Sequence, residues 1–295
     1  MTEPPKKVQQ TEGGFTAAYR NAAAAGSAQV SDSKSGLSID HRMTFRDPSM
    51  PLRERIAARI ASSVQGIDNP SCIDVACSTG TDLGLLARAL GDKPAQLHGV
   101  DLMEATLQVA REKLPAASFV QGDVVALPYP DVHFDSVQTS RLLVHVPDLK
   151  KAIDEMIRVL KPRGTCVISE GEMEKASVML SNDDRLLRVS EALRDHVAKM
   201  CANPRAASEA YRYILSHADA QDVCIEPFSF FLKKPGDMMG PELTHERQFL
   251  AKLVSEGALS QADADHYIAQ ATGRSAEEGN LLQLFFMAEI SFRKK

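Results

Sequence analysis

The sequence lacks tryptophan, has few aromatic residues and carries no excess of positive charge. Among its 295 residues 5% are aromatic, and the formal net charge is −5. Because nucleic-acid phosphates are bound by basic surfaces, this charge argues against a nucleic-acid partner. The chain also has no apolar run of about 18 residues and no signal peptide, so we expect it neither to span nor to cross a membrane.

Cysteine is scarce, and its spacing matches no familiar cysteine site. The odd number of cysteines includes no CxxC pair, and they are Cys72, Cys77, Cys166, Cys201 and Cys224. We therefore expect reduced thiols in an intracellular, cytoplasmic protein. Neither H-x-x-x-H nor a Cys/His cluster is present, so we expect no metal site. The absence of G-x-G-x-x-G also argues against a dehydrogenase.

What the sequence does contain is centred on residues 71–87, SCIDVACSTGTDLGLLA. A short β-branched run ends at Val75, small residues follow through Gly80, and apolar residues at helical spacing begin at Leu83, which together predict a strand, a tight turn and a helix. A turn of small residues lets the backbone approach a ligand, and the N-terminus of a helix offers unpaired N–H groups.

Two acidic residues follow the next two predicted strands. Asp101 ends the second strand, where nucleotide-binding α/β folds place the carboxylate that takes a ribose hydroxyl pair. Asp123 ends a third strand that begins at Phe119. A fourth strand is predicted over 134–139, a helix over 149–160 and a fifth strand over 165–169.

In this order the residues resemble the class I S-adenosylmethionine-dependent methyltransferases, over roughly residues 70–170. Their first motif, E/D-x-G-x-G-x-G, is met by residues 74–80, with Ala76 and Ser78 in place of two glycines. The later motifs match FDSVQTSRLLVHVPDLKKAIDEMIRVLKPRGTCVISE. The resemblance implies a Rossmann-like α/β fold, in which a seven-stranded, mostly parallel sheet is flanked by helices and its antiparallel last strand, near 281–292, lies at the edge.

The resemblance also implies a cofactor, S-adenosylmethionine, and a set of residues that bind it. Asp101 matches the ribose-binding acid and Asp123 the acid that contacts the adenine amino group, while Val124 offers its backbone N–H. The cofactor-binding set implied in this way is Tyr19, Asp74, Ala76, Ser78, Thr79, Gly80, Asp101, Leu102, Met103, Asp123, Val124 and Thr139.

The flanking segments divide the chain into three parts. Residues 1–12 are polar and rich in Pro and Lys, and we expect a disordered tail. Residues 13–66 form an N-terminal helical segment, either packed on the flank or serving as a lid and substrate segment, with a helix over 51–64. Residues 67–295 form the methyltransferase domain, with helical insertions at about 172–217 and 241–273.

Candidate catalytic residues lie after the fourth and fifth strands, at the edge where doubly wound sheets bind ligands. His145 is a candidate general base because its reference pKa is near 6.5; the alternative is a structural histidine. Arg141 is a candidate for substrate binding, as are His145 and Glu170, and Glu170 either orients a substrate or is solvated.

We therefore expect methyl transfer to an O, N or C nucleophile of a small-molecule metabolite or natural product, by an in-line displacement that needs no strong base. The alternatives are a non-catalytic or repurposed member, for example a cyclase, and a protein or peptide methyltransferase. A homodimer or higher homo-oligomer is also compatible with the sequence, since an N-terminal helix can close a neighbour's site.

Overall fold

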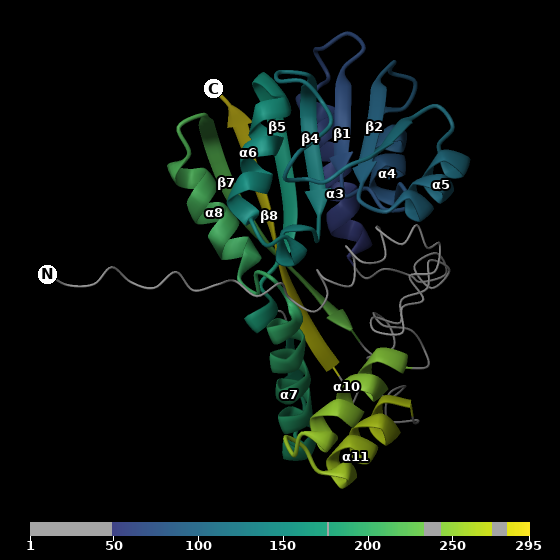
Figure 1. Cartoon of the computed structure of the whole chain (residues 1–295), viewed down its shortest axis with the longest axis vertical. Helices are drawn as coiled ribbons and strands as arrows, with labels where there is room; N and C mark the ends of the chain where they lie inside the picture. Colours follow the sequence, from purple (N-terminus) through teal and green to yellow (C-terminus); the bar gives the residue numbers. More distant parts are fainter. Residues whose placement is uncertain (1–48, 176, 233–242, 273–281) are drawn as a thin grey trace, which may run out of the picture.

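The computed structural model describes residues 49–175, 177–232, 243–272 and 282–295 (Figure 1). The expected tail at 1–12, most of the N-terminal segment at 13–66, and Tyr19 lie outside these residues. The helices are α3 (Met50–Ser63), α4 (Thr81–Leu90), α5 (Glu104–Lys113), η1 (Leu143–His145), α6 (Leu149–Val159), η2 (Met173–Lys175), α7 (Asp184–Met200), α8 (Ala206–Ser216), α10 (Thr244–Ser255) and α11 (Gln261–Thr272). The strands are β1 (Ser71–Val75), β2 (Gln96–Asp101), β3 (Ser118–Gln121), β4 (Phe134–Ser140), β5 (Leu160–Gly171), β6 (Ser177–Leu180), β7 (Ala220–Leu232) and β8 (Leu282–Lys294).

The strands form one sheet in the order β3-β2-β1-β4-β5-β8-β6, with β7 also paired to β8. The pairs among β1, β2, β3, β4 and β5 are parallel, whereas β8 is antiparallel to β5, β6 and β7. The expected α/β fold is therefore confirmed. The carboxyl ends of the parallel strands point toward α7, α10 and α11 (Figure 1).

Two details of the expected sheet are wrong. The last strand does not lie at the edge, because β8 has β5 on one side and β7 on the other. Its middle residues are accordingly buried on both faces of the sheet, as Glu289 and Ile290 show. The sheet also has an eighth strand, β6, which is only four residues long and continues the line of β5 along β8.

Alternation along the strands creates an apolar core on each face of the sheet. In β1, Cys72 belongs to the core with α3, α4 and α5, whereas its neighbour Ile73 belongs to the core with α6 and α8. The expected helix over 51–64 is confirmed as α3, which buries Leu52, Ile56 and Ile60 at helical spacing. Four of the five cysteines are buried, and Cys224 is exposed.

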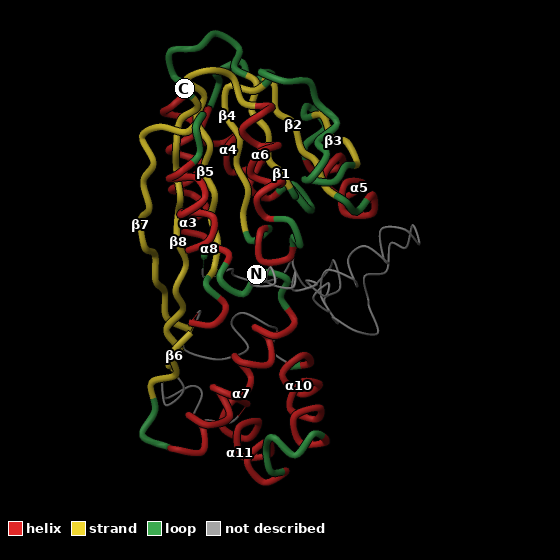
Figure 2. Tube along the Cα trace, turned by 60° about the vertical axis from the view of Figure 1, so that its left-hand side comes forward, coloured by secondary structure: helices red, strands yellow, loops and turns green. Residues whose placement is uncertain are grey.

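A third apolar cluster holds together the helices beyond the carboxyl ends of the strands. It joins α7, α10 and α11 with Met179 of β6, and its buried residues include Leu186, Phe249 and Tyr267. We call this group of helices the helical bundle. Strands β7 and β8 run from the main sheet toward it (Figure 2). Within the described part of the chain, no helix is long and apolar enough to span a membrane.

Candidate functional site

The turn between β1 and α4 has the backbone of a glycine-rich loop although it contains one glycine. Ala76, Ser78 and Gly80 have φ angles of 61°, 50° and 76°. The left-handed conformation costs a non-glycine residue on the order of 1–2 kcal/mol. Cys77 and Thr79 between them are buried. The buried side chains of Cys77 and Thr79 therefore fix the turn to the interior. The outer surface of the turn is formed by its backbone and by the small side chains of Ala76 and Ser78.

Close packing presses this turn against the neighbouring strand β2. A Cβ at Gly99 would lie 2.7 Å from the Cys77 Sγ atom and 2.5 Å from the Phe119 ring. The Cys77 N–H donates to the carbonyl of Val100 over 3.0 Å. Since a side chain at Gly99 would push the turn away, glycine there brings the ends of β1 and β2 together.

The Asp101 carboxylate links the turn to the end of β2. One oxygen accepts from the Ser78 N–H and the other from the Met103 N–H, each over 2.9 Å. Asp101 is half-buried, so its carboxylate remains at the carboxyl edge of the sheet. Its side chain thus joins the end of β2 to the turn after β1 and to the start of α5.

The second acidic residue, Asp123, lies one strand further along the same edge. Asp101 pairs with Gln121 of β3, and Asp123 follows two residues later. The Asp123 carboxylate accepts from the Val125 N–H over 3.1 Å, and Val124 is buried. Met103 is also buried and Leu102 is half-buried. The turn, Asp101 and Asp123 therefore form a continuous row across β1, β2 and β3, and this row fits an elongated nucleoside cofactor.

Two residues of the expected cofactor set lie inside the sheet rather than at its edge. Asp74 is 2% exposed, and burial raises the pKa of its carboxyl well above the usual range, with Asp82 adding to the effect. Arg53 pairs with Asp82 over 2.5 Å. The Thr139 hydroxyl is buried and donates to the Val75 carbonyl over 2.7 Å, so it ties β4 to β1.

Two of the candidate site residues, Arg141 and His145, follow β4. Arg141 is exposed with a φ of 54°, and its N–H donates to the Ser169 carbonyl over 2.8 Å. His145 ends the short helix η1 and is half-buried. The chain turn at Arg141 therefore leads directly from the end of β4 into η1.

Glu170 is neither solvated nor directed at the outer surface. It is 1% exposed, and its carboxylate accepts from the N–H groups of Leu143 at 2.7 Å, Val144 at 3.3 Å and Gly171 at 2.8 Å. Burial raises the pKa of Glu170 to about 7. The side chain thus satisfies the free N–H groups at the start of η1 and fixes this helix to β5.

Asn203, which the sequence pattern did not indicate, holds η1 from the opposite side. Its side-chain amide donates to the carbonyls of Leu143, over 3.0 Å, and Val146, and its backbone N–H donates to the Val144 carbonyl over 3.0 Å. A lone asparagine between two helical stretches gives no local signal of this role. Glu170 and Asn203 together fix the backbone that carries His145.

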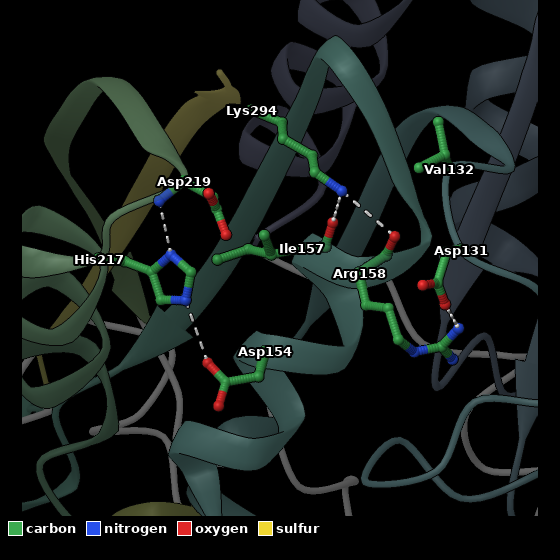
Figure 3. Close-up of a pocket in the computed structure, with 8 residues that line it drawn as sticks. All are labelled: Asp131, Val132, Asp154, Ile157, Arg158, His217, Asp219 and Lys294. Carbon is green, nitrogen blue, oxygen red and sulfur yellow. Dashed lines mark hydrogen bonds and ion pairs between the residues drawn. The ribbon is translucent and has the colours of Figure 1, made fainter.

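A cavity of about 320 Å³ lies at the opposite end of the sheet (Figure 3). It is lined by Asp131, Val132, Asp154, Ile157, Arg158, His217, Asp219 and Lys294. The Lys294 ammonium donates to carbonyls at the end of α6, including that of Ile157 over 2.7 Å, and Arg158 pairs with Asp131 over 2.7 Å. Both cations are paired with groups of the protein itself, at or near the carboxyl end of α6. We therefore interpret the residues around this cavity as stabilising the fold. Among the residues that the structure describes, no group of His, Cys, Asp and Glu could hold a metal ion.

Comparisons with known proteins agree with this geometry. Residues 73–168 match the family described as "Methyltransferase domain". A demethylmenaquinone methyltransferase of Shouchella clausii is 41% identical over 34% of this chain and 44% of its own length. A ubiquinone/menaquinone biosynthesis C-methyltransferase UbiE of Marinomonas sp. is 28% identical over 68% of this chain and 78% of its own length.

One solved structure shows the same fold. The YcgJ protein of Bacillus subtilis superposes with a TM-score of 0.55, covering 83% of this chain and 98% of that one at 16% identity. The chain spans 44% to 60% of the length of the first curated relatives that it matches. The matched residues, 73–168, include the turn, Asp101 and Asp123. Residues 73–168 therefore form a methyltransferase domain, of the kind found in the class I S-adenosylmethionine-dependent methyltransferases.

Proposed function

We propose that this protein transfers the methyl group of S-adenosylmethionine to an O, N or C nucleophile of a small-molecule acceptor. The observation that carries the proposal is the row formed by the 76–80 turn, Asp101 and Asp123 at one edge of the sheet. Two relatives named as quinone methyltransferases support a small-molecule acceptor.

In this proposal each part of the row binds one part of the cofactor. The backbone of the turn from Ala76 to Gly80 approaches the methionine part, and Asp101 accepts hydrogen bonds from the ribose hydroxyls. Asp123 and the Val124 N–H recognise adenine. Leu102 and Met103 pack against its ring.

S-adenosylmethionine supplies an activated methyl group on a sulfonium when it is bound. The chain has to hold the acceptor in line with that methyl group and exclude water, and alignment alone is worth on the order of 7–11 kcal/mol. His145 is the candidate that accepts the proton of the acceptor, because a neutral imidazole can take a proton near neutral pH. Glu170 and Asn203 act as positioning residues for the η1 backbone.

The first experiment is a calorimetric titration with S-adenosylmethionine and with S-adenosylhomocysteine. We expect both to bind and to stabilise the fold, by about 2.7 kcal/mol at 100 times the dissociation constant. Methyl transfer is then measured with labelled cofactor and a panel of phenols, quinols and amines. Failure of both cofactor forms to bind would refute the proposed function.

A further inference from the structure

Strands β7 and β8 continue past the carboxyl end of β5 and carry aromatic residues beyond it. The last residue of β5, Gly171, pairs with Met287 of β8. The next residue of β8 on the same face, Phe285, pairs with Phe230 of β7. At about 3.3 Å per residue, this pair lies about 7 Å beyond the end of β5. The pair therefore lies just beyond the carboxyl end of β5. Figure 2 shows β7 and β8 continuing from there toward the helical bundle.

Three phenylalanines form a continuous surface on this face, which we call the aromatic wall. The rings of Phe230 and Phe285 are stacked, with centroids 5.6 Å apart and planes at 9°. The ring of Phe228 lies 6.1 Å from that of Phe230. All three side chains are half-buried, so part of each ring faces outward.

The aromatic wall lies between two apolar cores without belonging to the interior of either. Phe228 and Met287 pack on the edge of the core around α3. Further along the same face, Met179 is buried in the core of the helical bundle. Phe230 and Phe285 fall between these two ends. The wall therefore spans the interval between the sheet's carboxyl edge and the helical bundle.

The charged residues beside Phe228 neutralise one another. Arg55 pairs with Glu289 over 2.8 Å, and Arg59 pairs with Glu226 over 2.6 Å. The Arg55 guanidinium also lies 5.5 Å from the centre of the Phe228 ring. Two cations and two carboxylates leave no net charge in this group, so the wall suits a neutral ligand better than an ion.

We propose that the aromatic wall binds a flat, apolar ring system of the methyl acceptor. The proposal rests on the proposed function, because the wall extends from the same carboxyl edge of the sheet as the cofactor row, with β5 and β4 between β8 and β1. Parallel phenylalanine rings with exposed faces favour offset or edge-on contact with a further aromatic ring. A ring held there extends toward the carboxyl ends of β4 and β5, where the methyl group is transferred.

The test uses 2-naphthol as a flat, neutral probe with the full-length protein. Because the chain has no tryptophan, the fluorescence anisotropy of the probe is measured without protein emission in its range. The titration is carried out with saturating S-adenosylhomocysteine. We expect Phe230→Ala and Phe285→Ala to weaken probe binding about 10-fold, the loss of one well-packed aromatic contact.

Phe231→Ala and Phe286→Ala are the matched controls. These phenylalanines belong to the same strands but to the opposite face, and they are 55% and 38% exposed. We expect less than about 2-fold change in probe binding, since exposed side chains lose little on truncation. Phe285→Leu keeps most of the apolar volume but removes the ring. Weaker probe binding with an unchanged melting temperature in this variant would show that the ring itself contacts the probe.

The outcomes separate this proposal from the proposed function. Cofactor binding without probe binding in the wild-type protein overturns the aromatic wall and leaves methyl transfer intact. Equal losses in the wall variants and the controls also overturn it. Failure to bind the cofactor itself refutes the proposed function instead.

Discussion

Replacing Glu246 by glutamine should stabilise the protein at alkaline pH and leave its stability unchanged at acidic pH. Glu246 lies in the first turn of α10, is 7% exposed, and its Oε2 atom is buried without a hydrogen-bond partner among the described residues. Burial raises its pKa from 4.5 to about 7. Between these two values the unfolded chain releases a proton that the folded protein retains, so stability falls as pH rises.

The size of the effect follows from this pKa. Each unit of pKa difference corresponds to 1.36 kcal/mol, so the carboxyl costs about 3 kcal/mol of stability above about pH 7. Glutamine has nearly the same shape and does not ionise. Because the protonated carboxyl and the amide are both neutral, we expect Glu246→Gln to raise the free energy of unfolding by about 3 kcal/mol at about pH 8, and by nothing at about pH 4.

Urea unfolding followed by circular dichroism measures this at each pH, since the chain lacks tryptophan. Glu170→Gln is the matched control, because its pKa is raised to about 7 as well. Its carboxylate, however, accepts three backbone N–H groups, and an amide nitrogen cannot accept them. That variant should be less stable at every pH. A loss of stability at about pH 8 in Glu246→Gln would show that the carboxylate is ionised and paired.

Three further predictions concern the edge of the sheet. Asp101→Ala should weaken cofactor binding by about 1–3 kcal/mol in calorimetry, the usual cost of losing a charged hydrogen-bond partner. An unchanged affinity would show that Asp101 does not bind the ribose. His145→Ala should lower turnover and leave cofactor affinity within about 2-fold; equal losses would indicate a structural histidine. Asn203→Ala should lower the free energy of unfolding by about 1–3 kcal/mol, because it removes the amide donor from the Val146 carbonyl and one of two donors from the Leu143 carbonyl. An unchanged midpoint in urea titration would contradict this.

The parts of the fold that local sequence determines were predictable. Leu52, Ile56 and Ile60 recur at helical spacing, and they are buried in α3 as that spacing requires. Asp101 follows a short apolar run, and it lies where such a strand must end. In each case the residues that carry the signal are neighbours along the chain.

The rest depends on contacts between residues that are distant in sequence. Pairing of β8 between β5 and β7 joins Ser169 to Glu289, and no periodicity in either strand specifies that partner. Glu170 is the penultimate residue of β5 at the ligand edge, but alternation puts it on the same face as Ile168, which packs with α6 and α8. Asn203 likewise acquires its role only when α7 and α8 bring it beside η1. Long-range packing thus decided which polar residues reach the surface.

The register of β7 and β8 has a consequence for how this architecture can be varied. Leu232 pairs with Gln283, so the chain leaves the sheet for α10 and α11 and returns to an adjacent position. Helices α10 and α11 thus belong to the connection between the two strands of one β-hairpin. Exchanging residues 233–282 for the corresponding connection of another member, or for a tight turn, would keep the ladder from Ala220 to Lys294 closed. The sheet and the cofactor row can therefore be kept constant while α10 and α11 are replaced as a cassette.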